Sequence, residues 1–449
     1  MKKSKKMKKE VGTLKIVIDK NTNYYALGGI PTMKKRTYRS KKVKQINWNK
    51  LKENFAGEAL ALAVDVAKQK QFALLTNQDG SVSELFRWQH PEETPTLLVA
   101  IQGLDCPVTA IVESTSTYGD ALRYQFRTHG FDVHQASAKR VHDAKEVYDG
   151  VPSLHDAKAA TIIARFYRDN LTHPWRELSV SERQLNALRR EFDMHQSQYQ
   201  RNQNRLEAFL SRHWPEVTYI LSSDSVAFEK LLMIYGSPEE VAANSEEAKK
   251  LLKKTSRSTL KSEKIDAVVQ SAQNTLGVPC VVAERQYLQA LATEMNHSRL
   301  QRRASKEALE AEVDSDEQLV EMAKLIGKVT TAVLLSFHLD PRNFKCARGF
   351  LKALGLNLKE KSSGRYVGQL KLTKRGNSKV RMYLYFAALR LIQKDSVVKE
   401  WYEKRAAPKA KLKTVVAVMR KLAKALWTVA QGQAFDAKKL FSVPSKKAA

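Results

Sequence analysis

The stretch Ala59-Leu-Ala-Leu-Ala-Val-Asp65-Val66 decides the fold, because one carboxylate interrupts a run that is otherwise apolar. A short apolar run of this kind predicts a strand buried on both faces of a sheet. Its expected partner is Gln71 to Thr76, and Ser83 to Trp88 predicts a third strand after the turn Asn77 to Gly80. A charge inside a buried strand is costly unless it is paired or binds a metal ion. Asp65 is therefore a candidate functional residue.

The residues after the third strand alternate between helical and strand patterns. We expect helices over Leu97 to Leu104 and Gly119 to Thr128, a fourth strand over Val108 to Glu113 and a last short strand over Phe131 to His134. Three strands in succession, followed by alternating helix and strand, are the order of a ribonuclease-H-like α/β layer.

Three acidic residues of this layer are candidates for one site. In a ribonuclease-H-like sheet the first and fourth strands are neighbours, so Asp65 and Glu113 are expected to project toward one another. Asp156 opens the helix Ala157 to Phe166, which is expected to pack against the same edge. Carboxylate oxygens are the ligands of hard divalent cations, and two such ions about 3.5–4 Å apart activate an attacking oxygen and stabilise a leaving one.

Each acid also has an ordinary explanation. Asp65 can end a strand at a turn, and Glu113 can cap the segment Ser114 to Tyr118. Ser153 and Asp156 fit a capping box, with Ser153 at the cap and Asp156 at the third helical position.

The rest of the chain has a predominantly helical pattern, so the expected fold class is α/β plus α. Residues 181 to about 310 are charged and nearly free of Gly and Pro, which predicts a helical hairpin or coiled coil that spaces domains or pairs subunits, with an inserted lobe around Ser237 to Lys264. From Leu319 we expect a compact helical domain with helices over Leu319 to Phe337, Cys346 to Leu354, Val380 to Lys394 and Ala410 to Thr428. The expected divisions are 1–55, a basic N-terminal extension; 56–178, the α/β domain; 179–316, the helical region; and 317–449, the C-terminal domain.

The basic residues are concentrated at the two ends of the chain. The net charge is +30, with +14 in residues 1–50, +19 in residues 351–449 and −3 in the remainder. A neutral body with two basic ends is typical of a polyanion binder, because each neutralised phosphate releases condensed counterions. A solubilising or membrane-surface role is the alternative, but the C-terminal charges lie among aromatic residues on patterned helices, which favours nucleic acid.

A second candidate site contains Ser362-Ser363-Gly364. A cluster of cations can stabilise a pentavalent phosphate, and Gly364 lets the backbone approach DNA, so either serine is a candidate nucleophile. The alternative is a polar loop that only grips phosphate. Gly376-Asn377 is expected to form a tight turn before the next helix. The residues expected to bind nucleic acid here are Lys361, Arg365, Lys371, Lys374, Arg375, Asn377 and Arg381.

Composition limits the class of protein further. An apolar content of 43% is enough for real cores, and the longest apolar runs are too short to span a bilayer, so we expect no membrane association. Cys106, Cys280 and Cys346 lack CxxC spacing and are expected to be reduced core residues of a cytoplasmic protein. Without cysteine partners, His142 and His155 are expected to have structural or phosphate-contacting roles rather than to bind zinc.

Several of these motifs occur together in one known family. The strand with Asp65, Glu113 followed by Ser-Thr-x-Thr-Tyr, the segment His155-Asp-Ala-Lys-Ala159 and the block Ser363-Gly…Lys374-Arg-Gly-Asn377…Arg381 resemble the DEDD-type transposases of the insertion-sequence one-ten family, which are bridge-RNA-guided recombinases. The likeness covers about residues 58 to 175 and 317 to 430, and its specificity comes from the order of the motifs. It implies a RuvC-like domain, a coiled coil and a C-terminal transposase domain that supplies the serine.

The resemblance also implies roles for individual residues. Asp65, Glu113 and Asp156 match three of the family's four acids, which bind Mg²⁺, and Ser363, directly before the glycine, best matches the nucleophile, with Ser362 one position away. The implied partners are donor and target DNA and a structured guide RNA. The implied assembly is a homo-oligomer, a dimer or tetramer in the bacterial cytoplasm or nucleoid, in which a partner subunit's serine completes each composite site.

The sequence departs from the family pattern at the fourth acid. The last two acids of the family usually stand as Asp-x-x-Asp, but Ser153 occupies the first of these places. Asp149 can substitute if the turn Gly150 to Pro152 brings it round; otherwise the second metal is weakly held or bound through water. The N-terminal extension and the lobe lie outside the likeness, and we expect extra RNA contacts from both. Leu325 to Ala332 resembles a degraded helix-hairpin-helix, which grips a nucleic-acid backbone.

Three functions are consistent with these features. The first is an RNA-guided, Mg²⁺-dependent DNA recombinase with a serine nucleophile. The second is a RuvC-like junction endonuclease, which hydrolyses DNA with metal and water and needs no serine. The third is a non-catalytic RNA-binding protein, for which the basic ends alone would suffice.

Overall fold

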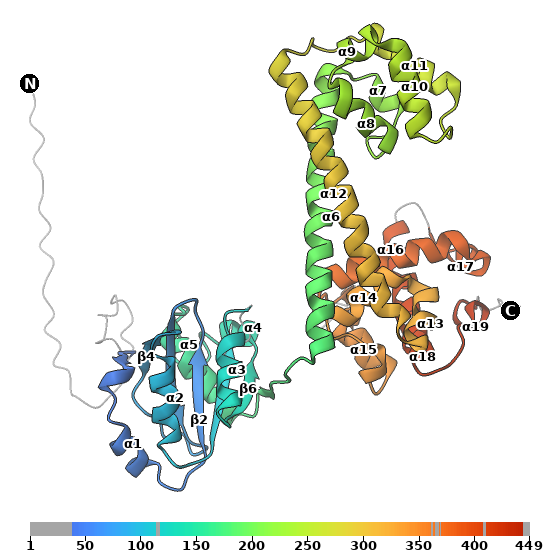
Figure 1. Ribbon diagram of the computed structural model, residues 1–449. Helices are drawn as coiled ribbons and strands as arrows, with labels where there is room; N and C mark the ends of the chain where they lie inside the picture. Colours follow the sequence, from blue (N-terminus) through green and yellow to red (C-terminus); the bar gives the residue numbers. More distant parts are fainter. Residues whose placement is uncertain are drawn as a thin grey trace, which may run out of the picture. The chain divides into compact units, whose positions relative to one another are not determined.

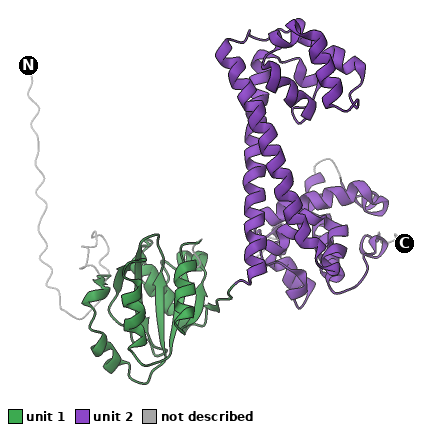
Figure 2. Cartoon of the chain, in the orientation of Figure 1, with its two compact units in different colours: residues 1–177 green, residues 178–449 purple. Residues whose placement is uncertain are grey.

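The structure is a computed structural model that describes residues 38–113, 117–360, 362–363, 368, 370–406 and 410–442. The chain divides into two compact units, residues 1–177 and residues 178–449, shown in different colours in Figure 2. The first unit is a mixed α/β layer and the second is helical apart from one short hairpin, which confirms the expected class of α/β plus α.

The first unit contains a seven-stranded sheet with β2 at its centre (Figure 1). β2 pairs antiparallel with β3 on one side and parallel with β5 on the other, so the first and fourth of the expected strands are neighbours. The strand order is β1-β4-β3-β2-β5-β6-β7. The strands are β1 (Lys41–Lys42), β2 (Leu60–Asp65), β3 (Lys70–Thr76), β4 (Phe86–Gln89), β5 (Val108–Glu113), β6 (Asp132–Ala136) and β7 (His173–Pro174).

Side chains alternate along β2 between two hydrophobic cores, one on each face of the sheet. Leu60, Leu62 and Val64 belong to the core that includes residues of α2 and α3, whereas Ala61 and Ala63 belong to the core that includes residues of α4 and α5. This alternation follows from the two-residue period of a strand. The helices of the unit are α1 (Trp48–Asn54), α2 (Thr94–Gln102), α3 (Asp120–Thr128), α4 (Ala138–Asp143) and α5 (Asp156–Arg168), with the 3₁₀ helix η1 (Val43–Gln45).

The folded domain begins before residue 56, where the sequence places its boundary. β1 pairs with β4 at the edge of the sheet, and the side chains of Val43, Ile46 and Phe55 are buried in the core on the α2 side. These apolar residues lack a regular period, so their burial could not be predicted without the sheet edge that receives them. Residues 1–37 lie outside the described residues.

Two long antiparallel helices form the frame of the second unit (Figure 1). α6 (Val180–His213) and α12 (Val282–Asp314) pack along one another, which agrees with the expected helical hairpin. A helical lobe connects them, and it is larger than the expected insertion at 237–264. Its helices are α7 (Val217–Ile220), α8 (Val226–Tyr235), α9 (Pro238–Ala243), α10 (Ser245–Thr255) and α11 (Ser262–Gln273).

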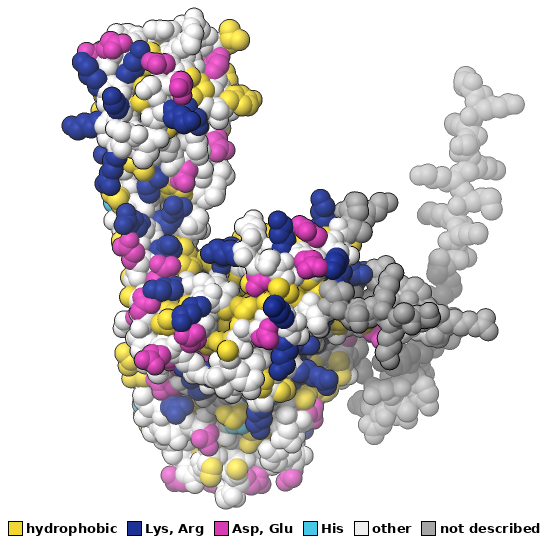
Figure 3. Space-filling view, turned by 90° about the vertical axis from the view of Figure 1, so that its right-hand side faces the viewer, with side chains coloured by type: hydrophobic (Ala, Val, Ile, Leu, Met, Phe, Trp, Pro, Cys, Tyr) yellow, Lys and Arg dark blue, Asp and Glu magenta, His cyan; other side chains and the backbone are white. Residues whose placement is uncertain are grey.

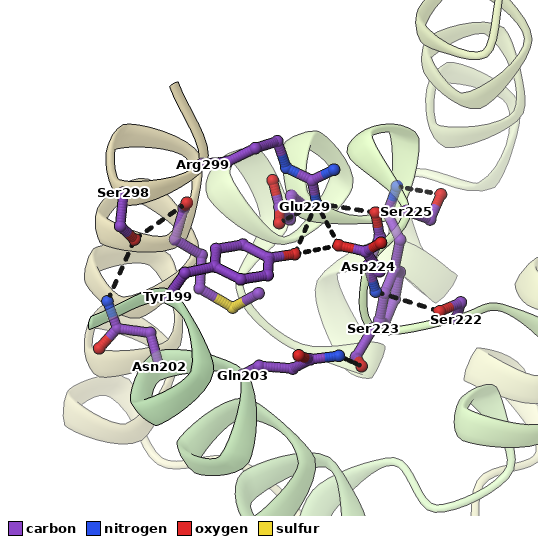
Figure 4. Close-up of polar contacts among 12 residues, drawn as sticks. Tyr199, Asn202, Gln203, Ser222, Ser223, Asp224, Ser225, Glu229, Ser298 and Arg299 are labelled. Atoms are coloured by element: carbon purple, nitrogen blue, oxygen red, sulfur yellow. Dashed lines mark hydrogen bonds and ion pairs between the residues drawn. The ribbon is translucent and has the colours of Figure 1, made fainter. Parts of the chain in front are cut away.

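A network of polar side chains joins the lobe to the helix pair (Figure 4). The Tyr199 hydroxyl of α6 donates a hydrogen bond to Asp224, and Nη2 of Arg299 on α12 donates to the Asp224 carbonyl oxygen at 2.8 Å and to the Glu229 carboxylate. Glu229 is fully buried; burial raises its pKa, and the Arg299 guanidinium opposes this rise. Leaving either charge without the other would be strongly destabilising, so the network holds the lobe in one orientation.

The rest of the second unit is a helical module, which we call the C-terminal module (residues 317–442). Its core also includes side chains from the N-terminal part of α6 and the C-terminal part of α12. The expected helix over Leu319 to Phe337 is broken at Gly327, whose φ of 87° ends one helix and begins the next. The elements are α13 (Glu317–Ile326), α14 (Lys328–Ser336), η2 (Pro341–Asn343), α15 (Ala347–Ala353), β8 (Leu358–Lys359), β9 (Lys371–Leu372), α16 (Ser378–Lys394), α17 (Ser396–Glu403), α18 (Lys411–Ala430) and α19 (Ala437–Leu440).

The cysteines are free, as expected, but they are not core residues. Cys106 and Cys280 are partly exposed, and Cys346 is exposed at the start of α15, where its Sγ accepts from the backbone N–H of Gly349. Among the described residues, no helix has the length and apolar character needed to cross a membrane.

Candidate active site

Asp65 and Glu113 lie at the same end of two neighbouring strands and on the same face of the sheet. β2 and β5 run parallel in a register that pairs Val64 with Val112, so Asp65 and Glu113 form the next pair. By the alternation along each strand, both acids fall on the face that α5 covers. The structure therefore brings together the two carboxylates that the sequence singled out.

The Asp65 carboxyl holds its proton to an unusually high pH. Burial, the hydrogen bond with the Glu113 side chain and the negative charges of Glu113 and Asp156 together raise the pKa of Asp65 from 3.8 to about 8, against a lowering contribution from the Val66 backbone N–H. Glu113 is 8% exposed, so water screens the pair poorly. Two carboxylates held this close repel one another unless a proton or a cation lies between them.

Asp156 lies at the first position of α5 and is exposed. Its charge acts on Asp65, which places it near the pair. The expected capping box is wrong: the N-cap is His155, whose Nδ1 accepts from the backbone N–H of Lys158 at 3.3 Å, and Ser153 lies outside the helix. His155 also packs edge-on against the ring of Tyr38, with 4.8 Å between the ring centroids.

The position of the fourth acid is governed by a buried lysine. Lys158 is 2% exposed, and its Nζ donates to Asp149 Oδ1 at 2.8 Å and to the carbonyl oxygens of Val151 and Ser153 at 2.8 and 2.9 Å. These three bonds hold the loop before α5 in place. Although partial burial raises the pKa of Asp149, the Lys158 ammonium and other hydrogen-bond donors lower it overall, so this carboxylate is committed to Lys158.

Arg123 supports Glu113 from the other side of its strand end, and the sequence did not identify it. This arginine is 4% exposed, and its Nη1 donates to the Glu113 carbonyl oxygen at 3.2 Å while its Nη2 donates to Asp120 at 2.6 Å. Gly119 makes room for it, since a Cβ at this position would lie 3.0 Å from Nη1 of Arg123. The sequence offered one signal of its burial, because Arg123 lies beside the apolar residues Leu122 and Phe126 on the same helix.

The two candidate serines lie in the loop of a short hairpin in the C-terminal module. β8 and β9 pair antiparallel, with Lys359 opposite Lys371, and the loop between them contains Ser362 and Ser363, both exposed. Ser362 Oγ donates to the Glu360 carboxylate at 3.0 Å. The expected phosphate contacts Lys361 and Arg365 lie outside the described residues.

The basic residues after the hairpin have different surroundings. Lys371, Lys374 and Arg375 are exposed, as a phosphate-binding role requires. Asn377 instead caps α16, and its Oδ1 accepts from the backbone N–H groups of Lys379 and Val380 at 2.9 and 3.3 Å. Nη1 of Arg381 donates to the Gly376 carbonyl oxygen at 2.8 Å.

Two glycines fix the loop that carries Lys374 and Arg375. A Cβ on Gly355, whose φ is 70°, would lie 2.7 Å from the Arg375 carbonyl oxygen. A Cβ on Gly376 would lie 2.5 Å from the Ala353 carbonyl oxygen. The two backbone segments therefore cross at a separation that only glycine permits. The expected turn at Gly376-Asn377 is present, and its basic residues are held against the end of α15.

Two family models match parts of the chain. The model of the family described as "Transposase IS116/IS110/IS902 family" matches residues 317–403, and a DEDD transposase model of IS110 type, described as "Transposase", matches residues 62–215. The chain belongs to the IS110 family of DEDD transposases. It is therefore an enzyme of DNA transposition. No curated protein matches this transposase.

The two matched segments of the transposase contain the two candidate sites. Asp65, Glu113 and Asp156 lie in the first matched segment, and the serine hairpin and the basic loop lie in the second. The lobe lies outside both. The family implies a divalent metal ion, for which Mg²⁺ is typical.

Within the described ranges, no group of three or more His, Cys, Asp or Glu side chains is gathered closely enough to hold a metal ion. The pair Asp65 and Glu113 nevertheless fits one, because Mg²⁺ is commonly held by one or two carboxylates, substrate phosphates and water. A cation would also offset the repulsion that raises the pKa of Asp65.

Proposed function

We propose that this transposase cleaves and rejoins DNA strands, using Mg²⁺ held by the pair Asp65 and Glu113 with Asp156 nearby, Ser363 as the nucleophile, and a structured guide RNA that selects the DNA sites. The observation that carries the proposal is the pair Asp65 and Glu113, which lie side by side at the ends of β2 and β5 so that the pKa of Asp65 is raised. Perturbed acids of this kind cluster at functional sites.

The carboxylates supply the anionic part of the site. Bound Mg²⁺ would neutralise charge that develops on the phosphate as a strand is cut. Asp65 would hold the cation as a carboxylate, and Arg123 keeps the Glu113 backbone in place. Asp156, exposed at the start of α5, would add negative charge near the pair. Asp149 is not included, because it is bound to Lys158.

The serine forms the covalent link to DNA. Its Oγ bonds to phosphorus as the bond from phosphorus to one sugar oxygen breaks; the hydroxyl proton leaves Oγ, and the sugar oxygen departs as a hydroxyl. Attack by a sugar hydroxyl on the same phosphorus rejoins a strand and restores the serine. Ser363 is favoured over Ser362 because the Ser362 hydroxyl already donates a hydrogen bond to the Glu360 carboxylate. The exposed cations Lys371, Lys374 and Arg375 can stabilise the negative charge of the phosphate.

The guide RNA and the oligomer rest on the charge distribution and the resemblance. A net charge of +14 in residues 1–50 and +19 in residues 351–449 exceeds what a single serine loop requires, and a second polyanion is a natural partner. Sequencing of the RNA that co-purifies with the protein tests this part: a single structured species supports a guide, and random cellular RNA contradicts it.

Covalent adducts test the serine. Labelled DNA and wild-type protein are expected to give an adduct that survives denaturation, and Ser363→Ala should abolish it while the matched control Ser362→Ala retains it. If adducts persist in both variants, the serine mechanism is wrong.

A metal-dependent junction endonuclease is the second candidate, because the pair Asp65 and Glu113 is complete without any serine. This function predicts that cleavage is lost in Asp65→Asn but retained in both serine variants. Cleavage of a branched DNA by the wild type, Asp65→Asn, Ser362→Ala and Ser363→Ala therefore separates the two functions.

A further inference from the structure

The lobe has a segregated distribution of charge. Residues 249–264 carry seven Lys and Arg side chains and a single acid, Glu263. The remaining residues of the lobe, 217–248 and 265–281, carry seven acids and one lysine. A lobe that is nearly neutral overall therefore has one strongly basic part.

Three acids of the lobe are paired with the helix α12. Asp224 and Glu229 bind Arg299 of α12 in the network of Figure 4, and Glu240 binds Arg285 of the same helix. These acids therefore form ion pairs with the arginines of α12 and do not neutralise the cations of residues 249–264. The cations of residues 249–264 lie on other elements, α10, α11 and the turn between them.

These cations cover the side of α10 that faces away from the lobe core. Ala248 and Leu252 are buried, whereas Lys250, Lys253 and Lys254 are exposed at positions that a period of 3.6 residues places on the opposite face. Side chains three or four residues apart on a helix are separated by about 5–6 Å, so they form a row.

The turn after α10 carries the next cation, Arg257, which is exposed. Its backbone is closed by hydrogen bonds from the N–H of Ser258 to the Lys253 carbonyl oxygen at 3.1 Å and from the N–H of Arg257 to that of Lys254 at 3.2 Å. Lys261 and Lys264 follow at the start of α11, both exposed. Among the described residues, Lys249 of this segment has carboxylate partners, Glu246 and Asp266, and no ion pair is found for the other six cations.

We propose that the lobe face formed by Lys250, Lys253, Lys254, Arg257, Lys261 and Lys264 binds the phosphate backbone of duplex DNA. The face has no aromatic residue between 249 and 264, and single-stranded nucleic acids are usually held by stacking of bases on aromatic side chains. Duplex DNA is the polyanion on which a transposase acts, and contacts to its backbone need only a row of cations. This proposal rests on the family's action on DNA and is independent of the serine and metal mechanism.

The basic face of the lobe lies far from the C-terminal module, at the other end of the α6–α12 pair. The lobe packs on one end of the α6–α12 pair, and the C-terminal module packs on the other (Figure 1). The 34 residues of α6 correspond to about 50 Å of helix. DNA bound at the lobe would therefore be contacted at a different place from DNA bound at the C-terminal module.

Binding to a duplex of arbitrary sequence tests the proposal. The full chain carrying Lys253→Ser, Lys254→Ser and Arg257→Ser is compared with a control carrying Arg303→Ser, Lys306→Ser and Lys324→Ser. The control loses the same charge, but each of its cations is paired with a glutamate. Fluorescence anisotropy is measured in Mg²⁺-free buffer over a range of salt concentrations, which excludes any contribution from catalysis.

The lobe variant is expected to bind DNA on the order of tenfold more weakly at low salt, with the slope of log K against log salt reduced by about 2–3, because each lost phosphate contact removes about 0.9 from the slope. The control should keep its slope within about one. Equal changes in the two variants would overturn the proposal, as would a loss of affinity for duplex RNA with none for duplex DNA. Circular dichroism checks that the lobe variant remains folded. Failure of the adduct test with unchanged lobe binding would affect only the proposed mechanism.

Discussion

At the scale of single residues, the Asp65 carboxyl defines the site. It ends a strand whose other residues are buried and apolar, and its neighbour in the parallel register is a second acid. The raised pKa of Asp65 keeps this carboxyl protonated up to about pH 8, which limits the repulsion between the two groups. A metal ion bound between them would relieve the same repulsion, as the proposed function requires.

The shifted pKa of Asp65 predicts how stability depends on pH. The folded pKa, about 8, lies above the ordinary value of 3.8, so between these values the folded state binds more protons than the unfolded state. Stability of the metal-free protein should therefore fall as pH rises from about 4 to about 8, by up to about 1.4 kcal/mol per pH unit. In Asp65→Asn this part of the dependence should disappear, and Mg²⁺ should stabilise the wild type but not the variant at pH 8. Urea denaturation as a function of pH measures both effects.

Lys158 predicts a second effect at this scale. Lys158→Met removes all three bonds of the ammonium and leaves the Asp149 carboxylate and two carbonyl oxygens without this donor. We expect a loss of about 2–4 kcal/mol in the free energy of unfolding, because hydrogen bonds to charged groups contribute about 1.5–3 kcal/mol each and partial hydration compensates. The control Lys139→Met, an exposed lysine with one weak ion pair to Asp143, should change stability by less than about 0.5 kcal/mol. Equal effects in the two variants would show that the Lys158 bonds contribute little.

At the scale of elements, the serine hairpin and the basic loop are held by backbone packing rather than by their own side chains. β8 and β9 are two residues long, which is too short for an independent hairpin. The crossing of Gly355 and Gly376 attaches β9 and the loop after it to α15, and Arg420 of α18 donates to the Leu356 carbonyl oxygen at 2.9 Å. The hairpin therefore depends on helices that are distant in the sequence.

The glycine crossing gives a prediction with an internal control. Gly355→Ala and Gly432→Ala both place alanine at a positive φ, 70° and 83°, which costs about 1–2 kcal/mol in each case. A Cβ at Gly432 meets nothing within 4 Å, whereas one at Gly355 overlaps the backbone of Arg375. Gly355→Ala should therefore lose clearly more stability and also weaken DNA binding, as measured by urea denaturation and anisotropy. If the two variants behave alike, the crossing does not hold the loop.

At the scale of the whole molecule, the two units have separate cores. The clusters of the first unit contain residues 43–166, and those of the second contain residues 185–441. The carboxylate site is built entirely from the first unit, and the serine hairpin entirely from the second. A chain of this design can carry two chemical groups on parts that fold independently.

This division predicts that residues 38–177 fold alone. The fragment should unfold cooperatively on heating and retain the pH dependence that Asp65 confers, because every group that shifts its pKa lies within this range. The same fragment carrying Asp65→Asn serves as the control. A fragment that lacks a cooperative transition by circular dichroism would contradict the separation of the cores.

Much of the fold and part of the site followed from local patterns. The apolar run before Asp65 and the run that ends at Glu113 predicted two buried strands, and their order predicted that they would be neighbours, because the period of a strand and the order of elements are properties of the sequence. The helical character of residues 181 to about 310 followed in the same way from the 3.6-residue period, whereas the bounds of α6 and α12 came from the structure. The resemblance to the family added the roles of the acids and the serine, and the role of each residue remains a proposal.

Other features depended on contacts between distant segments. His155 caps α5 in place of Ser153, since the chain before the helix is held by Lys158, and Asn377, expected to bind nucleic acid, is used as a helix cap. The sequence shows a basic segment in the lobe, but only the packing on α12 shows that Asp224, Glu229 and Glu240 are paired there and leave six cations of that segment without an ion pair among the described residues. The amino-acid sequence by itself determined which residues carry charge and which strands and helices form. Tertiary structure alone decided which charges are neutralised, because pairing and burial depend on groups that meet only when the chain has folded.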